Sequence, residues 1–568
     1  MELDLKTIPF SRYGSYFVIS QLKEGKYTLR DIHGGDMSPS ELFHFNFFET
    51  VDDERKELES IHAKADETAF VFTHPQDESK QARVSFPTPT DCLIESNGLE
   101  VSLDAEKVRY DTFYATGSDA YYYVSYKKEM KYGIATENVT VEAPWDRVGN
   151  HFIQIMMNGN EGTSRVYLKG QRTEAELDMT IPDWDEAQAE IKAEFENWKK
   201  ELPQVPTQFE ASRDLAGYLL WGNVVHAEGV MKSDVTYMSK NHMQNIWSWD
   251  NCFSGMGMAK SHPELAFNQY QVFMDHQADN GAYPDFMNDL FVSYNCVKPP
   301  IHAWAYKEMG ESNDLFYKEE KLLPIFESIE KSTHYWMNER RLDDSGLPFY
   351  THGNDSGWDN ASIFHHGMPV AAPELAAYLV RQMDILSEFA EKLGQSDKAT
   401  YWTEEADKMY KLLMDQLYDG KQFRAKKLGK DIYESDLPTR SLILNMTLVL
   451  SYRYPKEVTE KIVQALADNH ETKFGLTTEE LDSPYYVEDG YWQGPIWAPV
   501  TYIAIDALYK AGYTEMADRL AEKFCELTLV GGMAENYNAE TGTGNDDLAF
   551  TWPSAVFLLL GEKLIRDK

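Results

Sequence analysis

The sequence predicts a two-part protein, in which an antiparallel β-sandwich precedes a larger and mainly α-helical domain. The 568 residues exceed the usual size of one hydrophobic core. The first 180 residues or so alternate short β-rich runs with turns, whereas helical periodicity dominates after about residue 207. We therefore predict a β-sandwich over residues 1–180, a helical linker over 181–206 and a helical domain over 207–568.

The β-sandwich prediction rests on runs rich in Val, Ile, Tyr, Phe and Thr, separated by turn residues. Seven such runs are SYFVISQL, YTLRDIHGGD, ARVSFP, AYYYVSY, NVTVEA, HFIQIMM and SRVYLKG. Runs of this length and spacing are typical of antiparallel strands in a sandwich. The linker has a different composition. Its Ala, Glu and Lys residues with regularly spaced apolar residues predict a helix, which Pro203 and Pro206 end.

The second part is predicted to contain about a dozen helices. They are expected to begin near residues 209, 249, 263, 298, 313, 369, 397, 438, 455, 494, 515 and 551. No strand pattern alternates with them, which argues against a βαβ architecture. Such helices can pair as six hairpins in a closed ring or in an open solenoid, and the lack of a fixed-length repeat favours the ring.

Charge and cysteine usage limit the class of partner and the compartment. The formal net charge of −39 disfavours nucleic acid and anionic membranes and favours a neutral partner, although it is also compatible with a role in solubility alone. The four cysteines form no C-x-x-C pair, so neither a zinc site nor a disulfide framework is expected. The start of the chain has no signal-peptide pattern, and we predict a cytoplasmic protein.

Four long inter-helical segments carry the polar chemistry of the helical part. They are residues 279–297, 339–368, 469–493 and 529–550, and each places carboxylates beside aromatic residues, as in GNDSGWDNAS and VEDGYWQGPIW. Long loops in a compact domain are usually functional, and we expect these four to open on one face. Carboxylates and amides bind hydroxyl groups and flat rings cover the C–H face of a sugar, so the composition indicates a carbohydrate ligand.

Two of these carboxylates are candidates for acid–base chemistry at a glycosidic bond. Hydrolysis needs one acid to protonate the leaving oxygen and a second carboxylate as base or nucleophile, and we select Asp359 and Glu535. Trp358 is expected to desolvate Asp359 and raise its pKa, and the amide-rich surroundings of Glu535 are expected to keep it ionised. The alternative for each is a turn or helix-capping acid.

Motifs for cofactors and metals are absent from the sequence. There is no phosphate loop, no G-x-G-x-x-G after a strand and no H-E-x-x-H helix, so no cofactor is predicted. Adjacent histidines such as His365 and His366 point in different directions, which favours exposed or capping roles over metal binding. The segment NAETGTGNDD has the composition of a calcium loop without its spacing, so no metal is predicted.

Five segments in order resemble the inverting α-glycosidases of glycoside hydrolase family 63, which includes mannosylglycerate and glucosylglycerate hydrolases and has trehalases as distant relatives. The segments are WSWDNCF, VKPPIHAW, DSGWDNA, YWQGPIW and AENYNAETG. The resemblance implies an (α/α)6 barrel, often preceded by a β-sandwich, with Asp359 as general acid and Glu535 as general base. It implies a substrate site with Trp247, Trp249, Asp250, Asp285, Lys298, Asp355, Trp358, Asn360, Trp492, Gln493, Asn536 and Trp552.

The sequence departs from the family pattern at three of these positions. Gln493 replaces an Arg, Lys298 replaces a Gln and Asp355 replaces a Glu, which leaves the sugar and the leaving group open. The predicted activity is hydrolysis, with inversion, of an α-linked glucosyl or mannosyl unit in a small soluble glycoside or oligosaccharide. A phosphorylase, an epimerase, a retaining hydrolase and a carbohydrate-binding protein without catalysis are the alternatives.

Overall fold

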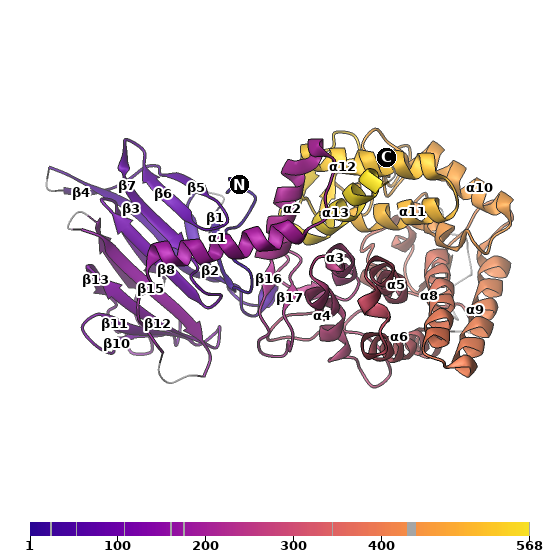
Figure 1. The fold of residues 1–568 in the computed structure, drawn as a ribbon, viewed down its shortest axis with the longest axis horizontal. Helices are drawn as coiled ribbons and strands as arrows, with labels where there is room; N and C mark the ends of the chain where they lie inside the picture. The colour runs from indigo at the N-terminus through magenta and orange to yellow at the C-terminus, as the bar shows by residue number, and fades with distance from the viewer. Residues whose placement is uncertain are drawn as a thin grey trace.

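The protein consists of an N-terminal antiparallel β-sheet domain and a C-terminal helical domain, which lie side by side (Figure 1). The structure is a computed structural model that describes residues 1–22, 25–52, 54–106, 108–159, 162–173, 177–342, 345–428 and 439–566. The order of a β-rich part followed by a helical part is the one that the sequence predicts. Within these residues, no helix is long and apolar enough to cross a lipid bilayer.

The β-domain is built from two antiparallel sheets. The first sheet has the order β1 (Phe17–Gln21), β2 (Tyr27–Asp31), β3 (Glu41–Val51), β9 (Glu100–Ala105), β14 (Ile153–Asn158) and β13 (Val139–Glu142), with β4 (Glu54–Glu57) paired to β3. The second has the order β10 (Thr112–Ala115), β11 (Ala120–Ser125), β12 (Met130–Glu137), β15 (Ser164–Gln171), β8 (Asp91–Asn97), β7 (Asp77–Ser85), β6 (Phe70–His74) and β5 (His62–Ala65). All seven predicted runs contain a strand.

Aromatic side chains fill the space between the two sheets. Phe72 of β6 lies 5.2 Å from the ring of Phe45 and 4.7 Å from that of Phe47, both on β3. Tyr27 of β2 contacts Phe70 of β6 at 5.5 Å. Inward rings alternate with outward residues along these strands, as expected for sheets that bury one face against each other.

Helix α1 (Trp184–Glu201) contacts both domains (Figure 1). It begins at Asp183, whose carboxylate accepts a hydrogen bond of 3.0 Å from the Glu186 N–H and so caps the helix. Trp184 in its first turn packs in a buried cluster on the β-domain, beside Leu93 and Tyr167. Trp198 in its last turns stacks on His262 of the helical domain at 3.6 Å. The predicted linker segment thus contributes to both cores.

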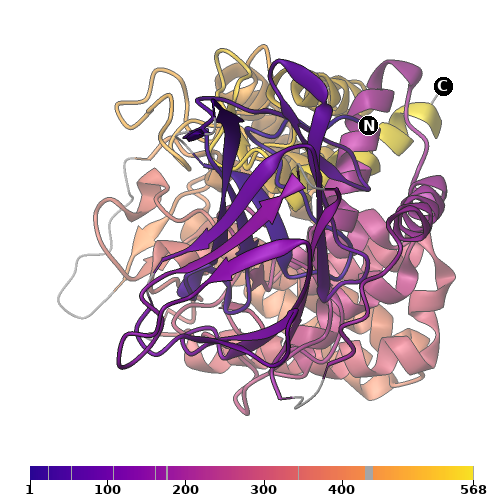
Figure 2. The same cartoon turned by 90° about the vertical axis from the view of Figure 1, so that its left-hand side faces the viewer.

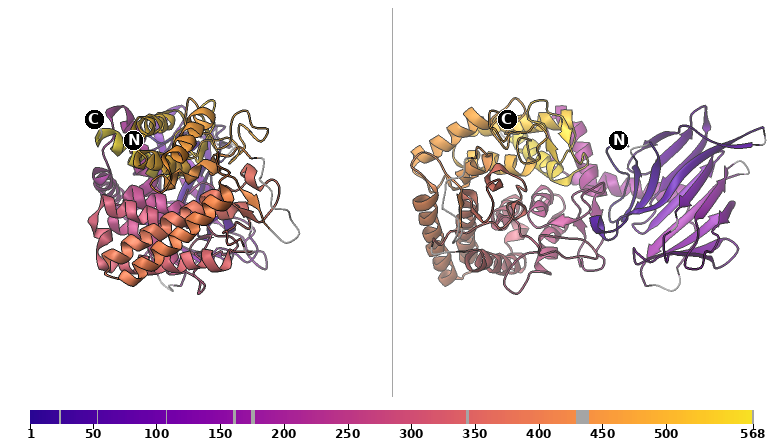
Figure 3. Two further views of the ribbon diagram at one scale, coloured as in Figure 1. Left: turned by 90° about the vertical axis from the view of Figure 1, so that its right-hand side faces the viewer. Right: turned by 180° about the vertical axis from the view of Figure 1, so that it is seen from behind.

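The helical domain is a closed ring of inner helices surrounded by outer ones (Figure 3). The inner elements are α3 (Asp250–Met258), α5 (His302–Ser312), α8 (Pro373–Lys392), the 3₁₀ helix Leu442–Leu450, α11 (Ala498–Lys510) and α13 (Thr551–Arg566). Each packs on the next, and α13 packs on α3 and closes the ring. The outer elements are α2 (Glu210–Gly222), α4 (Pro263–Met274), α6 (Glu319–Glu339), α9 (Ser396–Leu417), α10 (Lys456–Ala465) and α12 (Thr514–Gly531).

Most predicted helix starts agree with the structure to within a few residues, but one helix type is wrong. The helix expected near residue 438, a position outside the described residues, is instead the 3₁₀ helix Leu442–Leu450. Its sequence LILNMTLVL contains three β-branched residues, which weaken α-helix propensity. The helix expected near residue 313 is α6, which begins at Glu319 after a short 3₁₀ turn over Asp314–Tyr317.

Short elements connect the helices. Two-residue strands pair as β16 (Val224–Val225) with β17 (Val235–Thr236), β18 (Ile246–Trp247) with β19 (Phe286–Met287), β20 (Val370–Ala371) with β21 (Lys426–Lys427) and β22 (Asn536–Tyr537) with β23 (Gly544–Asn545). Helix α7 covers only Gly353–Ser356, and a π-helical turn covers Leu466–His470. Four of these elements, β19, α7, β22 and β23, lie entirely in the long loops that the sequence indicates.

Buried polar contacts join the two domains. The ammonium of Lys240 is fully buried and donates to Ser11 Oγ at 3.0 Å and to Val224 O at 3.0 Å, which lie in different domains. Arg172 at the end of β15 forms ion pairs with Glu228 and Asp289. Since Asp289 closely follows β19, the β-domain directly supports one of the long loops.

Candidate active site

The four long loops meet, as the sequence predicts, and hydrogen bonds link each to the next. Lys298, directly after the first loop, donates from Nζ to Asn354 O in the second at 2.7 Å. In the second loop, Asn360 Oδ1 accepts from the Trp492 N–H of the third at 2.9 Å. Tyr491 in the third loop donates from its hydroxyl to Glu535 Oε1 in the fourth at 2.8 Å. Residues far apart in sequence therefore form one site.

Asp355 organises the loop that carries Asp359. Its buried carboxylate accepts hydrogen bonds from Arg340 Nη1 at 3.0 Å, from the Thr351 N–H at 2.7 Å and from the Val297 N–H at 3.0 Å. The His352 N–H also donates to it and completes a capping box at the start of α7. With both oxygens occupied by protein donors, Asp355 is suited to holding the loop in place.

Asp359 is partly buried beside a tightly packed turn. Gly357 adopts a φ of 71° there, and a Cβ on it would lie 2.4 Å from the indole of Trp249, so only glycine fits. Burial raises the pKa of the Asp359 carboxyl, while the nearby charge of Lys298 lowers it. The net direction is upward, as the sequence predicts for an acid that is to be protonated before reaction.

Lys298 is the cation at the centre of three acids. Its Nζ lies 2.9 Å from Asp285 Oδ1, and both side chains are nearly inaccessible to solvent. The charges of Asp285, Asp359 and Asp250 outweigh the burial of Lys298 and raise the pKa of its ammonium. Burial raises the pKa of Asp250 to about 8, and its buried Oδ2 has no hydrogen-bond partner among the residues that the structure describes. An unpartnered carboxylate oxygen here is an acceptor available to a hydroxyl group.

Glu535 is buried in a second acidic environment, and the expectation that it stays ionised is wrong. Burial raises the pKa of its carboxyl to about 8, and the charges of Asp546 and Asp547 add to this effect. The hydrogen bond from Tyr491 lowers the pKa but does not compensate. The amides near it in sequence bond elsewhere, since Asn536 Nδ2 donates to Asp546 Oδ2 at 2.7 Å.

Tyr491 connects the two candidate catalytic acids. Burial raises the pKa of its phenol most, and the charges of Glu535, Asp359 and Asp250 raise it further, so its hydroxyl lies in the field of all three carboxylates. Its backbone has a φ of 62°, a conformation that is costly for a bulky residue and that recurs at functional sites. Asp359 and Glu535 therefore belong to one electrostatic cluster.

Tryptophan rings form the wall of this cluster. Trp492 stacks on Trp497 at 3.8 Å and contacts Trp358 at 5.0 Å and Trp249 at 6.3 Å. Trp552 at the start of α13 contacts Trp249 and donates from Nε1 to Glu535 O at 3.1 Å. Burial is the largest cause of the raised pKa values of Asp250, Asp359 and Glu535, and these buried rings form part of their surroundings.

The remaining predicted residues occupy supporting or peripheral positions. Asn360 and Gln493 bond to each other's loop, with Gln493 Nε2 donating to Asn360 O at 2.7 Å. The Asn536 side chain fixes the β22–β23 hairpin beside Glu535. Trp247 packs on Phe286, next to Asp285, at 5.8 Å. His365 contacts Gln493 and His366 contacts Tyr485, so both histidines have protein partners.

Three residues of the site were not selected from the sequence. Tyr491 and Trp497 lie within YWQGPIW, a segment quoted for its motif, but their roles depend on contacts with Glu535 and Trp492. Arg340 follows α6 and pairs with Asp355 at 3.0 Å. No sequence signal marks Arg340, because its partner lies fifteen residues away in the same long loop and the fold of that loop brings the two together.

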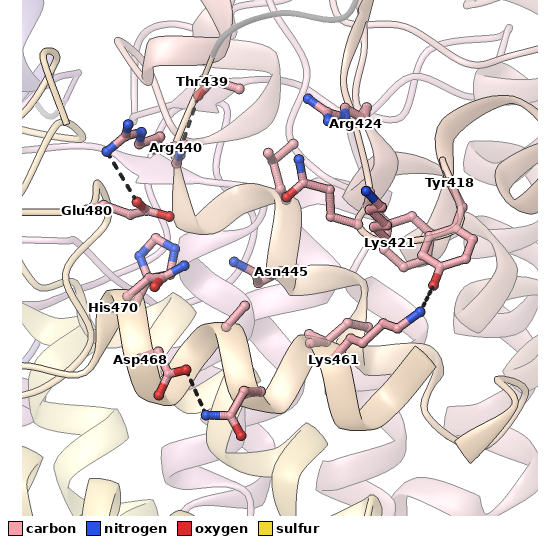
Figure 4. Close-up of a pocket in the computed structure, with 18 of the residues that line it drawn as sticks. Tyr418, Lys421, Arg424, Thr439, Arg440, Asn445, Lys461, Asp468, His470 and Glu480 are labelled. Carbon is pink, nitrogen blue, oxygen red and sulfur yellow. Dashed lines mark hydrogen bonds and ion pairs between the residues drawn. The ribbon is translucent and has the colours of Figure 1, made fainter. Parts of the chain in front are cut away.

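A separate cavity of about 800 Å³ lies beside α10 and contains none of the predicted site residues (Figure 4). Arg440, Lys421, Lys461 and Arg424 line it. Its two acids have partners, since Glu480 lies 3.7 Å from Arg440 and Asp468 accepts from Gln464 at 2.7 Å. Both described acids of this cavity therefore already have protein partners, unlike Asp250 of the Asp359–Glu535 cluster.

Removal of the central cation is expected to destabilise the fold, and more at high pH. Lys298→Met leaves three buried carboxyls uncompensated, and breaking a buried ion pair costs about 3–5 kcal/mol. The pKa values of these acids then rise further, and stability from a group with a raised pKa is lost as pH increases. Urea unfolding at pH 5 and pH 8 should therefore show the larger loss at pH 8.

Lys456→Met is the matched control for this experiment, because Lys456 forms an exposed ion pair of 3.0 Å with Glu460 on α10. We expect a change of less than about 1 kcal/mol in this control at either pH. An equal loss of stability in both variants, or a loss in Lys298→Met that does not depend on pH, would contradict the role given to Lys298.

Comparison with known proteins gives the class of this site. The family model for the mannosylglycerate hydrolase MGH1-like glycoside hydrolase domain matches residues 243–553, more than half of the chain and all the candidate site residues. The chain belongs to this family. It is a glycosidase of the glycoside hydrolase family 63 type, which confirms the resemblance predicted from the five sequence segments.

Individual relatives agree with this assignment. A mannosylglycerate hydrolase from Rubrobacter radiotolerans is 23% identical over 55% of this chain and 89% of its own length. The GH63 mannosylglycerate hydrolase from Thermus thermophilus, solved in complex with glucose, has a TM-score of 0.51 at 18% identity over 60% of this chain and 98% of that one. A bacterial glucoamylase complexed with acarbose covers 100% of this chain and 95% of its own, with a TM-score of 0.63 at 11% identity. The last similarity extends the shared fold to the β-domain.

Proposed function

We propose that the protein hydrolyses an α-linked glucosyl or mannosyl unit of a small soluble glycoside or oligosaccharide, with inversion at the anomeric carbon. The observation that carries this proposal is the convergence of Asp359 and Glu535 around Tyr491, within a wall of tryptophan rings. The closed ring of inner helices is, on this proposal, an (α/α)6 barrel that presents its long loops to the substrate. No cofactor is required for such a reaction.

Asp359 is proposed as the general acid and Glu535 as the general base. Asp359 gives its proton to the glycosidic oxygen as the bond from that oxygen to the anomeric carbon breaks. Glu535 takes a proton from a water molecule whose oxygen bonds to the opposite face of the same carbon. The raised pKa of Asp359 favours the protonated form that a general acid needs, whereas Glu535 must lose its proton before each turnover.

The other residues divide by the contacts that they make. Asp250 and Asp285 are proposed to accept hydrogen bonds from sugar hydroxyls, and Trp249, Trp358 and Trp492 to enclose the ring. Residues whose polar groups already bind protein are proposed to hold the loops: Asp355, Asn360, Gln493, Asn536 and Trp552. Apart from Asp285, which pairs with Lys298, this division follows from which polar atoms already have a protein partner.

A panel of candidate substrates tests the activity. We expect release of free glucose or mannose from at least one of glucosylglycerate, mannosylglycerate, trehalose, kojibiose and nigerose when each is incubated with the purified protein. A requirement for inorganic phosphate, with a sugar phosphate as product, would instead indicate a phosphorylase. Binding of these sugars without any turnover would contradict the proposed hydrolase.

Tyr491 provides a more specific test of the role of Glu535. Tyr491→Phe removes the donor that lowers the pKa of Glu535, so that pKa should rise and the base should stay protonated to higher pH. We expect the rising limb of the plot of kcat/KM against pH to move to higher pH. At pH 7, kcat/KM should fall about tenfold for each unit by which the pKa of Glu535 rises, and it should recover at higher pH.

Tyr537→Phe is the control for Tyr491→Phe. Tyr537 is buried in the same loop as Glu535, and its hydroxyl donates to Gly532 O at 2.9 Å instead of to a carboxylate. Its loss should leave the pH profile in place. A uniform loss of activity at all pH values in Tyr491→Phe would show that the tyrosine supports the loop alone.

A further inference from the structure

Exposed aromatic side chains gather at one end of the β-domain. Tyr110, Tyr126 and Trp145 expose 46%, 66% and 60% of their surface, and Val148 in the same region exposes 44%. By contrast, most rings on the inner faces of the two sheets are buried. Single exposed apolar residues need no explanation, but a cluster of exposed rings marks an interaction surface.

These residues come from three neighbouring loops. The rings of Tyr110 and Tyr126 are 5.4 Å apart at an angle of 63°. The loop of Trp145 and Val148 ends at Gly149, where a Cβ would lie only 2.8 Å from Asp111 O. The loop therefore packs directly against the segment of Tyr110. We call the surface formed by Tyr110, Tyr126, Trp145 and Val148 the aromatic end.

Buried polar residues hold the aromatic end in shape. The carboxylate of Asp111 accepts from the Tyr126 N–H at 2.8 Å and from the hydroxyl of Tyr123 at 2.9 Å. The side chain of Asn150 accepts from the Phe113 N–H at 2.6 Å and donates to Ala143 O at 2.7 Å. Tyr110 itself has a φ of 74°, a costly conformation that persists only where neighbours enforce it. The rings are presented on a fixed frame.

The aromatic end lies on the side of the β-domain that adjoins the helical domain. Tyr126 lies in the turn between β11 and β12, and these two strands lie together with β10 (Figure 1). In Figure 2 the β-domain faces the viewer and the helical domain lies behind it. In the turn between β11 and β12, Lys128 donates from Nζ to Asp31 O at 2.8 Å. Three residues after Asp31, the Gly34 N–H donates to Asp289 Oδ1 at 2.7 Å, in the loop that carries Asp285. A chain of contacts thus connects the aromatic end to a loop of the candidate site.

We infer that the aromatic end is a second carbohydrate-binding surface, which holds a neutral glycan chain outside the catalytic site. Tyr and Trp offer flat faces to the C–H side of sugar rings, and a hydroxyl or N–H at the ring edge. The same chain carries a glycosidase domain, and its net charge of −39 disfavours an anionic polymer. This inference rests on the family and does not depend on the roles of Asp359 and Glu535.

Electrophoresis of the full-length protein in native gels that contain soluble starch, glycogen or mannan tests the inference. We expect at least one of these neutral glycans to retard the protein. The combined variant Tyr110→Ala, Tyr126→Ala and Trp145→Ala should bind that glycan about tenfold or more weakly, because exposed aromatic anchors dominate such interfaces. Its rate on a small substrate should stay within about twofold of the unaltered protein, since exposed positions rarely affect folding.

Two controls separate this outcome from others. Tyr401→Ala removes a ring of 39% exposure on α9, far along the chain, and should leave retardation unchanged. Tyr126→Ala alone retains the backbone bond to Asp111 and should still weaken retardation if the combined variant fails to fold. Absence of retardation with all three glycans would overturn the inference, as would unchanged retardation of the combined variant. Sedimentation that shows a dimer dissociated by the substitutions would instead assign the surface to a second copy of the chain.

Discussion

Asp359→Asn is expected to lower kcat by about 10²–10⁴-fold on a natural glycoside, because general acid help to the leaving oxygen is lost. The substitution keeps the shape of the side chain and removes the proton that the raised pKa of Asp359 retains. The loss should be much smaller on a glycosyl fluoride, since fluoride leaves without full protonation. Steady-state rates on the two substrates measure the difference.

Asp279→Asn is the matched control for Asp359→Asn. Asp279 is exposed in another of the four long loops, and the same carboxylate-to-amide change there should leave both rates within about twofold of the unaltered protein. A loss in Asp359→Asn that is equally large on the fluoride and on the natural glycoside would show that Asp359 is not the general acid.

Glu535→Gln is expected to lower kcat by a similar factor of about 10²–10⁴ on both kinds of substrate, because water activation is needed whatever the leaving group. The free protein should show kcat/KM rising with pH up to about 8, as Glu535 loses its proton. That limb should disappear from the residual activity of Glu535→Gln. A retained limb would assign it to another group, such as Asp250.

The same substitution has an expected effect on stability. The pKa of Glu535 is 4.5 in an unfolded chain and about 8 in the fold, so the stability associated with its protonated form is lost as pH rises through this interval. Glu535→Gln cannot ionise and should therefore unfold at a higher temperature than the unaltered protein above pH 8. Since one pKa unit corresponds to about 1.36 kcal/mol, the gain should be a few kcal/mol and should vanish near pH 4.

Short-range sequence patterns are sufficient to predict the main architecture, a β-rich domain followed by a helical domain. Apolar spacing locates the helices, and capping residues such as Asp183 and prolines such as Pro263 mark their starts. The sequence patterns did not predict strands with few apolar residues. Examples are β4, whose sequence ERKE is fully polar, and β5, whose sequence is HAKA. These segments become strands because their neighbours offer edges for pairing, which is a tertiary effect.

The site was predictable in its residue types and less so in its electrostatics. The motifs identify Asp359, Glu535 and the tryptophans as candidates, because these residues lie in segments that are unusually rich in acidic and aromatic residues. The ionisation of Glu535 was predicted wrongly, because its pKa depends on burial and on Asp546 and Asp547, which a backbone hydrogen bond holds close. The central position of Lys298 among three acids likewise depends on loops that meet only in the folded chain.

Proton NMR of the first product formed from a confirmed α-glycoside tests the central proposal most directly. The proposed pairing of Asp359 as acid and Glu535 as base predicts that the β-anomer of the free sugar appears first and that the α-anomer grows later by mutarotation. Initial appearance of the α-anomer would mean retention through a covalent intermediate on a carboxylate, and would contradict the account of how these two residues act.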